Sequence, residues 1–246
     1  MSSKQHSMTF ICWSLLLVLG VTQSHAQGVE VTAKIVVNKI LASADKKHKD
    51  SPETANVVLW LSSLKPDPPT PPPPARQTPY RLVQKNKMFT PHLLVVPAGT
   101  SVQFPNEDPF FHNVFSLFNG KRFDLGLYES GTTRSVRFDR EGVSYIFCNI
   151  HPEMGAVVLA LSTPYFGISS ETGAVAIHNV PPGSYRLNVW SENGRSINPA
   201  IAEQIVQISS DSVNLGNIVL QSTTDVLANH KNKFGEDYEP SHDTQY

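Results

Sequence analysis

Three side chains that bind soft metal ions lie close together in one short segment of the sequence. Cys148, His151 and Met154 follow one another in the pattern Cys-x2-His-x2-Met. A thiolate, an imidazole and a thioether suit copper, and so short a loop allows them to converge on one point. Copper that exchanges single electrons needs a second imidazole, for which His112, upstream, is the candidate. The sequence therefore predicts a copper site with one-electron chemistry.

Zinc is the main chemical alternative for this cluster. Methionine is a poor ligand for zinc, and no further nitrogen or thiolate is apparent that would complete a tetrahedral site. His92 and His178 lie at or in predicted strands and are expected to be surface or packing residues. His48, His230 and His242 lie in polar segments, where no other feature supports a metal site.

The first residues indicate export. Lys4 precedes an uncharged apolar run from Phe10 to Val21, and Ser24-His25-Ala26 places small residues where a signal peptidase cuts. Residues 1–26 are therefore predicted to be a cleaved signal peptide of a periplasmic or secreted protein. The apolar run is about half of the ~20 residues that a transmembrane helix needs, so no transmembrane span is expected.

Cleavage would remove Cys12 and leave Cys148 as the single cysteine of the mature chain. Thiols of exported proteins usually form disulfides, so an unpaired one requires another role, such as metal binding. The whole chain of 246 residues has 20 basic and 21 acidic residues, and this balance gives no indication of a nucleic-acid partner.

The remaining sequence reads as short strands without an amphipathic helix, which predicts an all-β fold. A proline-rich spacer is expected over residues 65–79, because its prolines cannot pair in a central strand and favour polyproline II. Residues 222–246 are polar and poor in apolar side chains, so they are expected to be a loose surface tail.

Several short motifs surround the candidate ligands. They are Phe89-Thr90-Pro91, Val96-Pro97-Ala98-Gly99-Thr100-Ser101-Val102, Asn106-Glu107-Asp108, and Gly142 ahead of Cys148. Together with the Cys-x2-His-x2-Met loop, which is closest to that of amicyanin, they resemble the cupredoxin family of small blue copper proteins. The resemblance implies that residues 80–162 form a Greek-key β-sandwich with one type 1 copper ion.

By this resemblance Cys148 supplies the thiolate, His112 and His151 supply the equatorial nitrogens, and Met154 makes the long axial contact. Asn113 matches the residue that braces the cysteine loop. One departure concerns the strand before Cys148. Its two positions that are usually aromatic in the family hold Ser144 and Ile146, whereas Tyr145 and Phe147 are out of step, and a bulge would account for this shift.

Four apolar residues are expected to surround the exposed edge of His151, where a redox partner would dock. They are Pro109, Phe110, Phe111 and Pro152. The resemblance implies such a patch, because cupredoxins contact their redox partners through an apolar surface, and transient electron-transfer contacts are small. The alternative is that the two phenylalanines belong to the core.

The hairpin Glu171-Thr172-Gly173 and the turn Pro181-Pro182-Gly183 resemble the carboxypeptidase-regulatory or transthyretin-like β-sandwich. That family's opening strands are missing here, but Val57-Val58-Leu59-Trp60-Leu61, far earlier in the chain, is similar to them. Residues 28–64 and 163–221 are therefore predicted to form one split sandwich with the copper domain inserted. The alternative is two independent neighbours, with residues 28–64 as a leading arm.

Two functions follow from these features. The first is single-electron transfer between exported redox proteins, with a cytochrome or oxidoreductase as partner. The second is a non-catalytic binding or copper-handling module, in which the second sandwich holds a protein or a glycan. No enzyme activity is expected, because the His-x-His pairs of multicopper oxidases are absent and four ligands leave no position open for a substrate.

Overall fold

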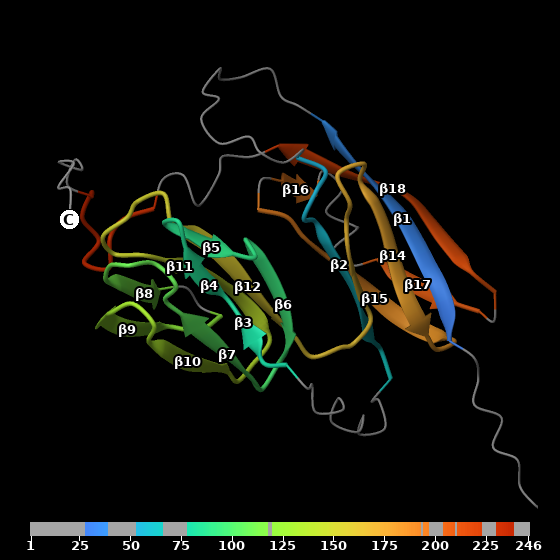
Figure 1. Cartoon of the computed structure of the whole chain (residues 1–246). Helices are drawn as coiled ribbons and strands as arrows, with labels where there is room; N and C mark the ends of the chain where they lie inside the picture. Colours follow the sequence, from blue (N-terminus) through green and yellow to red (C-terminus); the bar gives the residue numbers. More distant parts are fainter. Residues whose placement is uncertain are drawn as a thin grey trace, which may run out of the picture.

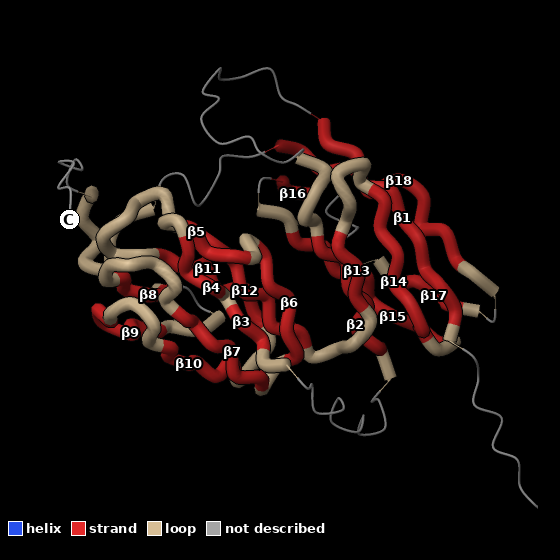
Figure 2. Tube along the Cα trace, viewed as in Figure 1, coloured by secondary structure: helices blue, strands red, loops and turns tan. Residues whose placement is uncertain are grey.

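The computed structural model in Figure 1 describes residues 28–38, 53–65, 78–117, 120–192, 194–196, 204–209, 211–222 and 230–238. All regular elements in this part of the chain are strands (Figure 2), which confirms the predicted all-β fold. The same residues contain no helix that is long and apolar enough to cross a membrane. The predicted signal peptide and nearly all of the proline-rich spacer lie outside the described residues.

Eight strands form one β-sandwich, which we call the flanking sandwich. They are β1 (Val29–Asn38), β2 (Val58–Ser63), β13 (Phe166–Ile168), β14 (Ala174–Val180), β15 (Gly183–Trp190), β16 (Gly194–Ser196), β17 (Ile205–Ile208) and β18 (Val213–Ser222). Their two sheets have the orders β14-β1-β18-β16 and β13-β2-β15-β17. Strands from the beginning of the chain thus pair with strands from its later part.

The side chains of the flanking strands alternate between core and solvent. Along β1, Val31 and Ile35 are each 1% exposed, whereas Glu30 and Lys34 lie at the surface. Because neighbouring residues of a strand face opposite sides, this alternation gives each sheet one apolar face. The two apolar faces meet in a shared core that includes Leu61 of β2.

The other ten strands form the inner sandwich. They are β3 (Tyr80–Arg81), β4 (Val83–Lys85), β5 (Met88–Thr90), β6 (Leu93–Pro97), β7 (Thr100–Pro105), β8 (His112–Ser116), β9 (Phe123–Tyr128), β10 (Thr133–Phe138), β11 (Gly142–Phe147) and β12 (Gly155–Leu161). Sheets of order β10-β7-β3 and β6-β12-β11-β8-β9 enclose its core, and β4 pairs with β5 as a hairpin. Since β11 lies between β8 and β12, the start of β8, the end of β11 and the start of β12 meet at one end of the sheet.

A separate apolar cluster joins the two sandwiches, which lie side by side in Figure 1. Leu159 and Leu161 of β12 pack with Val58 of β2, and none of the three is more than 1% exposed. Trp60 and Trp190 pack around them, partly buried. β12 is consequently covered on both faces, which explains why its sequence is almost continuously apolar.

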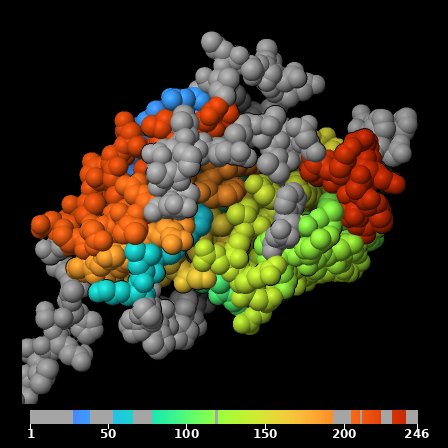
Figure 3. Space-filling view, turned by 180° about the vertical axis from the view of Figure 1, so that it is seen from behind, coloured from blue at the N-terminus to red at the C-terminus, as the bar shows by residue number. Residues whose placement is uncertain are grey.

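Residues 230–238 lie against the inner sandwich, as the space-filling view shows (Figure 3). Lys233 pairs with Asp124 at 2.8 Å, and the Tyr238 hydroxyl donates to the carbonyl oxygen of Cys148 at 2.9 Å. The expectation of a loose tail is wrong for these nine positions. A polar segment needs no apolar face when backbone and carboxylate groups of its neighbour accept its hydrogen bonds.

Two glycines of the flanking sandwich allow a matched test of its packing. Gly173 has φ +82 and an added Cβ would lie 2.5 Å from the Ile35 carbonyl oxygen, whereas Gly216 has φ +71 and open space around it. Gly216→Ala should cost only the left-handed backbone penalty, about 1–2 kcal/mol. Gly173→Ala should cost about 2–4 kcal/mol, because overpacking adds to that penalty. Urea unfolding, followed by the fluorescence of Trp60 and Trp190, measures the difference, and equal losses would contradict this packing.

Candidate metal centre

The loop between β11 and β12 carries the cluster predicted from the sequence. Phe147 and Gly155 pair across the two antiparallel strands, so Cys148 and Met154 face each other at the base of the loop. The Cys148 amide donates to the Met154 carbonyl at 3.2 Å, and the Met154 amide donates to the His151 carbonyl at 3.1 Å. These bonds fold seven residues into a compact turn. Cys148 and Met154 are both fully buried in the core of the inner sandwich.

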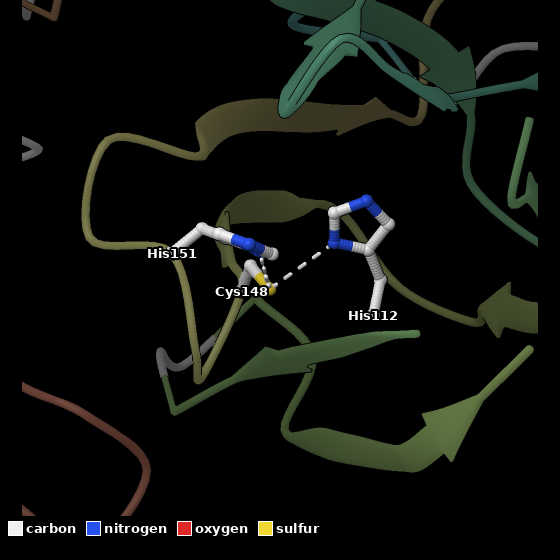
Figure 4. A group of neighbouring side chains, drawn as sticks. All are labelled: His112, Cys148 and His151. Atoms are coloured by element: carbon white, nitrogen blue, oxygen red, sulfur yellow. Dashed lines mark hydrogen bonds between the residues drawn. The ribbon is translucent and has the colours of Figure 1, made fainter. Parts of the chain in front are cut away.

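His112, the first residue of β8, completes a group of three donors. Its Nδ1 lies 3.7 Å from the Cys148 sulfur, and the Nδ1 of His151 lies 3.5 Å from the same atom. Figure 4 shows both imidazoles with a ring nitrogen turned toward the sulfur. The three donor atoms all lie within 4.8 Å of one another.

These separations fit a shared metal ion. Two donors that each bind one ion at about 2.0–2.3 Å lie roughly 3.5 Å apart when the angle between the bonds is near tetrahedral or trigonal. Cys148 is also a buried free cysteine, with no disulfide partner among the described residues. One thiol and two imidazoles aimed at one point are therefore able to hold a metal ion, and Met154 is the predicted fourth ligand.

Asp108 determines which nitrogen of His112 faces the sulfur. Its carboxylate lies 2.8 Å from His112 Nε2, and both side chains are buried. Nε2–H donates to this carboxylate, which leaves the Nδ1 lone pair free for a metal ion. Sequence reasoning included Asp108 in a family motif but gave it no role. Its position four residues before a candidate histidine ligand was the available signal.

The Asp108 carboxylate is itself fixed by a hairpin turn. The backbone amides of Asn86 and Lys87, between β4 and β5, donate to its two oxygens at 2.6 and 3.0 Å. Both residues have φ of 55°, the left-handed conformation that such a tight turn requires. Burial raises the pKa of Asp108, but the hydrogen bonds from Lys87, His112 and Asn86 outweigh it and lower the pKa overall. The carboxylate is therefore charged at neutral pH.

The two histidines are prepared to bind metal as neutral imidazoles. Burial lowers the pKa of His112, against the opposing effect of Asp108. Burial, together with the nearby charges of His112 and Lys87, lowers the pKa of His151 to about 4. At neutral pH both rings thus have a nitrogen lone pair available.

The thiol lies in an environment with two opposing effects. Burial raises the pKa of Cys148, which favours the neutral thiol. The backbone amides of Ile150, Asn113 and His151 hydrogen-bond to the sulfur and favour the thiolate. A cation between the imidazoles would replace the thiol proton, and these amides would then stabilise the sulfur charge.

Asn113 links this sulfur to a neighbouring strand. Besides its amide contact to Cys148, its side-chain Nδ2 donates to Asp124 Oδ1 at 2.7 Å. Asp124 follows Phe123 on β9, the edge strand beside β8. Sequence reasoning did not single out Asp124, since nothing in the local pattern distinguishes it from any polar residue of an edge strand.

The four residues of the predicted docking patch differ in exposure. Pro109 and Phe111 lie at the surface, and Phe111 is 54% exposed. Pro152 is half-buried in the cysteine loop. Phe110, also half-buried, packs on the rings of both histidines, with centroid distances of 5.1 Å to His112 and 5.7 Å to His151. Neither phenylalanine belongs to the core cluster of the inner sandwich.

The strand before Cys148 is regular. β11 pairs with β12 in unbroken register from Gly142 to Phe147, so no bulge separates these two strands. Ile146 and Cys148 share the core, and Ser144 is buried on the same face. Phe147 packs on the opposite face against Phe115, at 5.8 Å between centroids. Tyr145 and Phe147 are one position away from the aromatic positions of the cupredoxin family, because their side chains lie on the other face of the sheet.

Two further histidines lie apart from the group. His92 pairs with Glu192 at 2.7 Å, across the two sandwiches, and His178 pairs with Glu30 at 3.0 Å. Both side chains are exposed, as expected for surface residues. His48 and His242 lie outside the described residues.

Comparison with known protein families gives no match, and neither does comparison with curated proteins. Among solved structures, a purple cupredoxin from Nitrosopumilus maritimus is 26% identical with a TM-score of 0.31, covering 33% of this chain and 99% of that chain. An amicyanin variant in the Cu(I) form is 17% identical with a TM-score of 0.32, covering 34% and 82%. A copper-containing nitrite reductase from Thermus scotoductus is 19% identical with a TM-score of 0.34, covering 52% and 28%.

Replacing Asp108 by asparagine tests its effect on His112. The asparagine amide can donate to Nε2, which would move the histidine proton to Nδ1 and block the lone pair that faces Cys148. Copper affinity, measured by competition with a chelator, should fall about 10- to 100-fold. Asp139→Asn is the control, because Asp139 is exposed and, among the described residues, forms ion pairs with Lys121 and Arg137, away from the three donors. An unchanged affinity in Asp108→Asn would contradict this role.

Proposed function

We propose that this chain is an exported type 1 copper protein that carries single electrons between redox partners. The observation that supports it most is the group of buried Cys148, buried His112 and half-buried His151, whose donor atoms lie within 4.8 Å of one another. One soft thiolate and two imidazoles, with a weak thioether such as Met154, form the ligand set that stabilises both oxidation states of copper. Copper bound there supplies a reversible one-electron couple.

The protein's contribution is to hold the ligands in place before the metal arrives. His112 is oriented by Asp108, and Cys148 and Met154 are fixed by the hydrogen bond across the loop base. Ligands that need not move between oxidation states keep the rearrangement small on electron transfer. This fixed orientation of the side chains distinguishes the group from a surface cluster that binds metal by chance.

The route for the electron is proposed to be His151. Its ring is half-buried, in contrast to His112, which is fully buried. Exposed Phe111 and half-buried Pro152 give the neighbourhood the apolar character of small, transient redox interfaces. A cytochrome or oxidoreductase with a complementary apolar patch is the proposed kind of partner.

A carrier rather than an enzyme is proposed because the four side chains would fill the coordination sphere. No position would then remain for a substrate or oxygen to bind. Export is proposed from the signal-like residues 1–26 and from the unpaired Cys148.

Visible and paramagnetic-resonance spectra of the copper-loaded protein test this function. The wild type should show the intense thiolate-to-copper absorption of a type 1 site, and Cys148→Ser should abolish it, because serine offers no thiolate. His151→Asn should also lose the type 1 spectrum, whereas His178→Asn, a histidine of the flanking sandwich, should keep it.

A colourless copper-loaded wild type, or zinc as the only metal in protein purified from cells, would overturn the electron-transfer proposal. The alternative of a binding module would then gain support if Cys148→Ser left binding to the protein's partner unchanged.

A further inference from the structure

Residues 230–238, which we call the C-terminal strap, contact the copper-ligand loop directly. The Tyr238 hydroxyl donates to the backbone oxygen of Cys148 at 2.9 Å. The Lys233 amide donates to the side-chain oxygen of Asn149, the next residue, at 2.9 Å. Cys148 and Asn149 are therefore both hydrogen-bonded to a segment that supplies no candidate ligand.

The strap also covers the end of β11, the strand that precedes Cys148. The His230 ring stacks on Phe147, with 3.9 Å between centroids and 12° between planes. His230 Nε2 lies 2.9 Å from the Tyr238 hydroxyl. When that hydroxyl donates to Cys148, its oxygen is free to accept from Nε2–H, so His230 orients the tyrosine.

A second connection reaches the site through β9 and β8. The Lys233 ammonium pairs with Asp124 Oδ2 at 2.8 Å, and Asp124 Oδ1 accepts from Asn113 Nδ2 at 2.7 Å. Asn113 follows ligand His112, and its amide contacts the Cys148 sulfur. The strap is thus linked to both strands that position the thiol.

The strap has its own fixed shape between these contacts. The side-chain oxygen of Asn232 accepts from the amides of Phe234 and Glu236 at 2.9 and 3.0 Å. Gly235, with φ +83, donates its amide to the Asn232 carbonyl at 3.0 Å. A closed turn of this kind keeps Lys233 and Tyr238 at a set separation, so little order has to be gained when both bind the inner sandwich.

We infer that the C-terminal strap is a positioning element of the metal centre, in which Tyr238 and Lys233 hold the Cys148 loop and Asn113 in their metal-binding arrangement. The effect of the strap on the reduction potential rests on the proposed function, that is, on copper bound at this centre. A hydroxyl hydrogen directed at the Cys148 carbonyl places the positive end of a dipole near the ligand, and this favours the less positive, reduced state. Removing it should lower the reduction potential.

Tyr238→Phe tests the inference first in the metal-free protein. Amide hydrogen exchange of Cys148 and Met154, the two amides that close the loop, should become about three- to tenfold faster, in proportion to the loss of one part-buried hydrogen bond. Tyr185→Phe is the matched control, because its hydroxyl also donates to a backbone oxygen, that of Pro181, but in the flanking sandwich. The control should leave both rates unchanged.

A second pair of variants addresses the Asp124 connection. Lys233→Met removes the charge and keeps the length, so it should accelerate exchange of the Cys148 amide, and Lys233→Arg should restore protection. In copper-loaded protein, Tyr238→Phe should also lower the potential and speed copper release to a chelator, relative to Tyr185→Phe.

Unchanged exchange in both Tyr238→Phe and Lys233→Met would overturn the strap's positioning role, as would an equal change in Tyr185→Phe. These results are separate from those for the proposed function. Faster exchange in a protein whose copper-loaded form is colourless would support the strap and reject type 1 copper, and a type 1 spectrum with unchanged exchange would do the reverse.

Discussion

The hydrogen bond between the His112 imidazole and the buried Asp108 carboxylate is the contact on which the centre depends. An imidazole can face a metal with either nitrogen, and only a fixed proton on Nε2 leaves Nδ1 for the thiol side. The carboxylate tolerates burial because three N–H groups share its charge. Two of them come from the β4–β5 turn. A hairpin that supplies no candidate ligand therefore determines which nitrogen of His112 is available to a metal ion.

The rest of the inner sandwich extends this principle of orientation by hydrogen bonds. β11 brings Cys148 to the end of the sheet, the loop base brings Met154 opposite it, and β8 supplies His112 from the neighbouring strand. The backbone of each of these three residues is therefore held by strand pairing or by the hydrogen bond at the base of the loop. Cys148 is buried between them, and the backbone amides of Ile150, Asn113 and His151 hydrogen-bond to its sulfur.

The parts of the centre that the sequence reveals are those with local spacing. Cys148, His151 and Met154 are close in the chain, so their common function can be inferred from the pattern alone. The brace from Asp108 depends on the direction of one ring nitrogen, which spacing does not encode. Tyr238 was missed because its bond goes to a backbone oxygen, and a backbone acceptor leaves no trace in the residue types.

The fold shows a similar division. β1 and β2 are evident from alternating or apolar runs, and an all-β chain follows from them and the later strands. The sequence pattern did not predict β18 as a strand. Its pairing with β1 shifts register near Gly216, and the extra residue breaks the alternation that would mark a strand. The tail was misjudged because composition measures apolar content, while residues 230–238 are held by polar contacts.

The pairing of β2 with β13 has a consequence for the order of assembly. Ser63 ends one strand and Phe166 begins the other, so their pairing must close a loop of about a hundred residues, at an entropic cost that grows with loop length. Once the intervening chain has folded into the inner sandwich, most of that cost is already met. The flanking sandwich is therefore expected to complete last. An ion that stabilises the inner sandwich would then also stabilise the flanking sandwich by linkage. The supply of metal would therefore govern how long the whole protein stays folded.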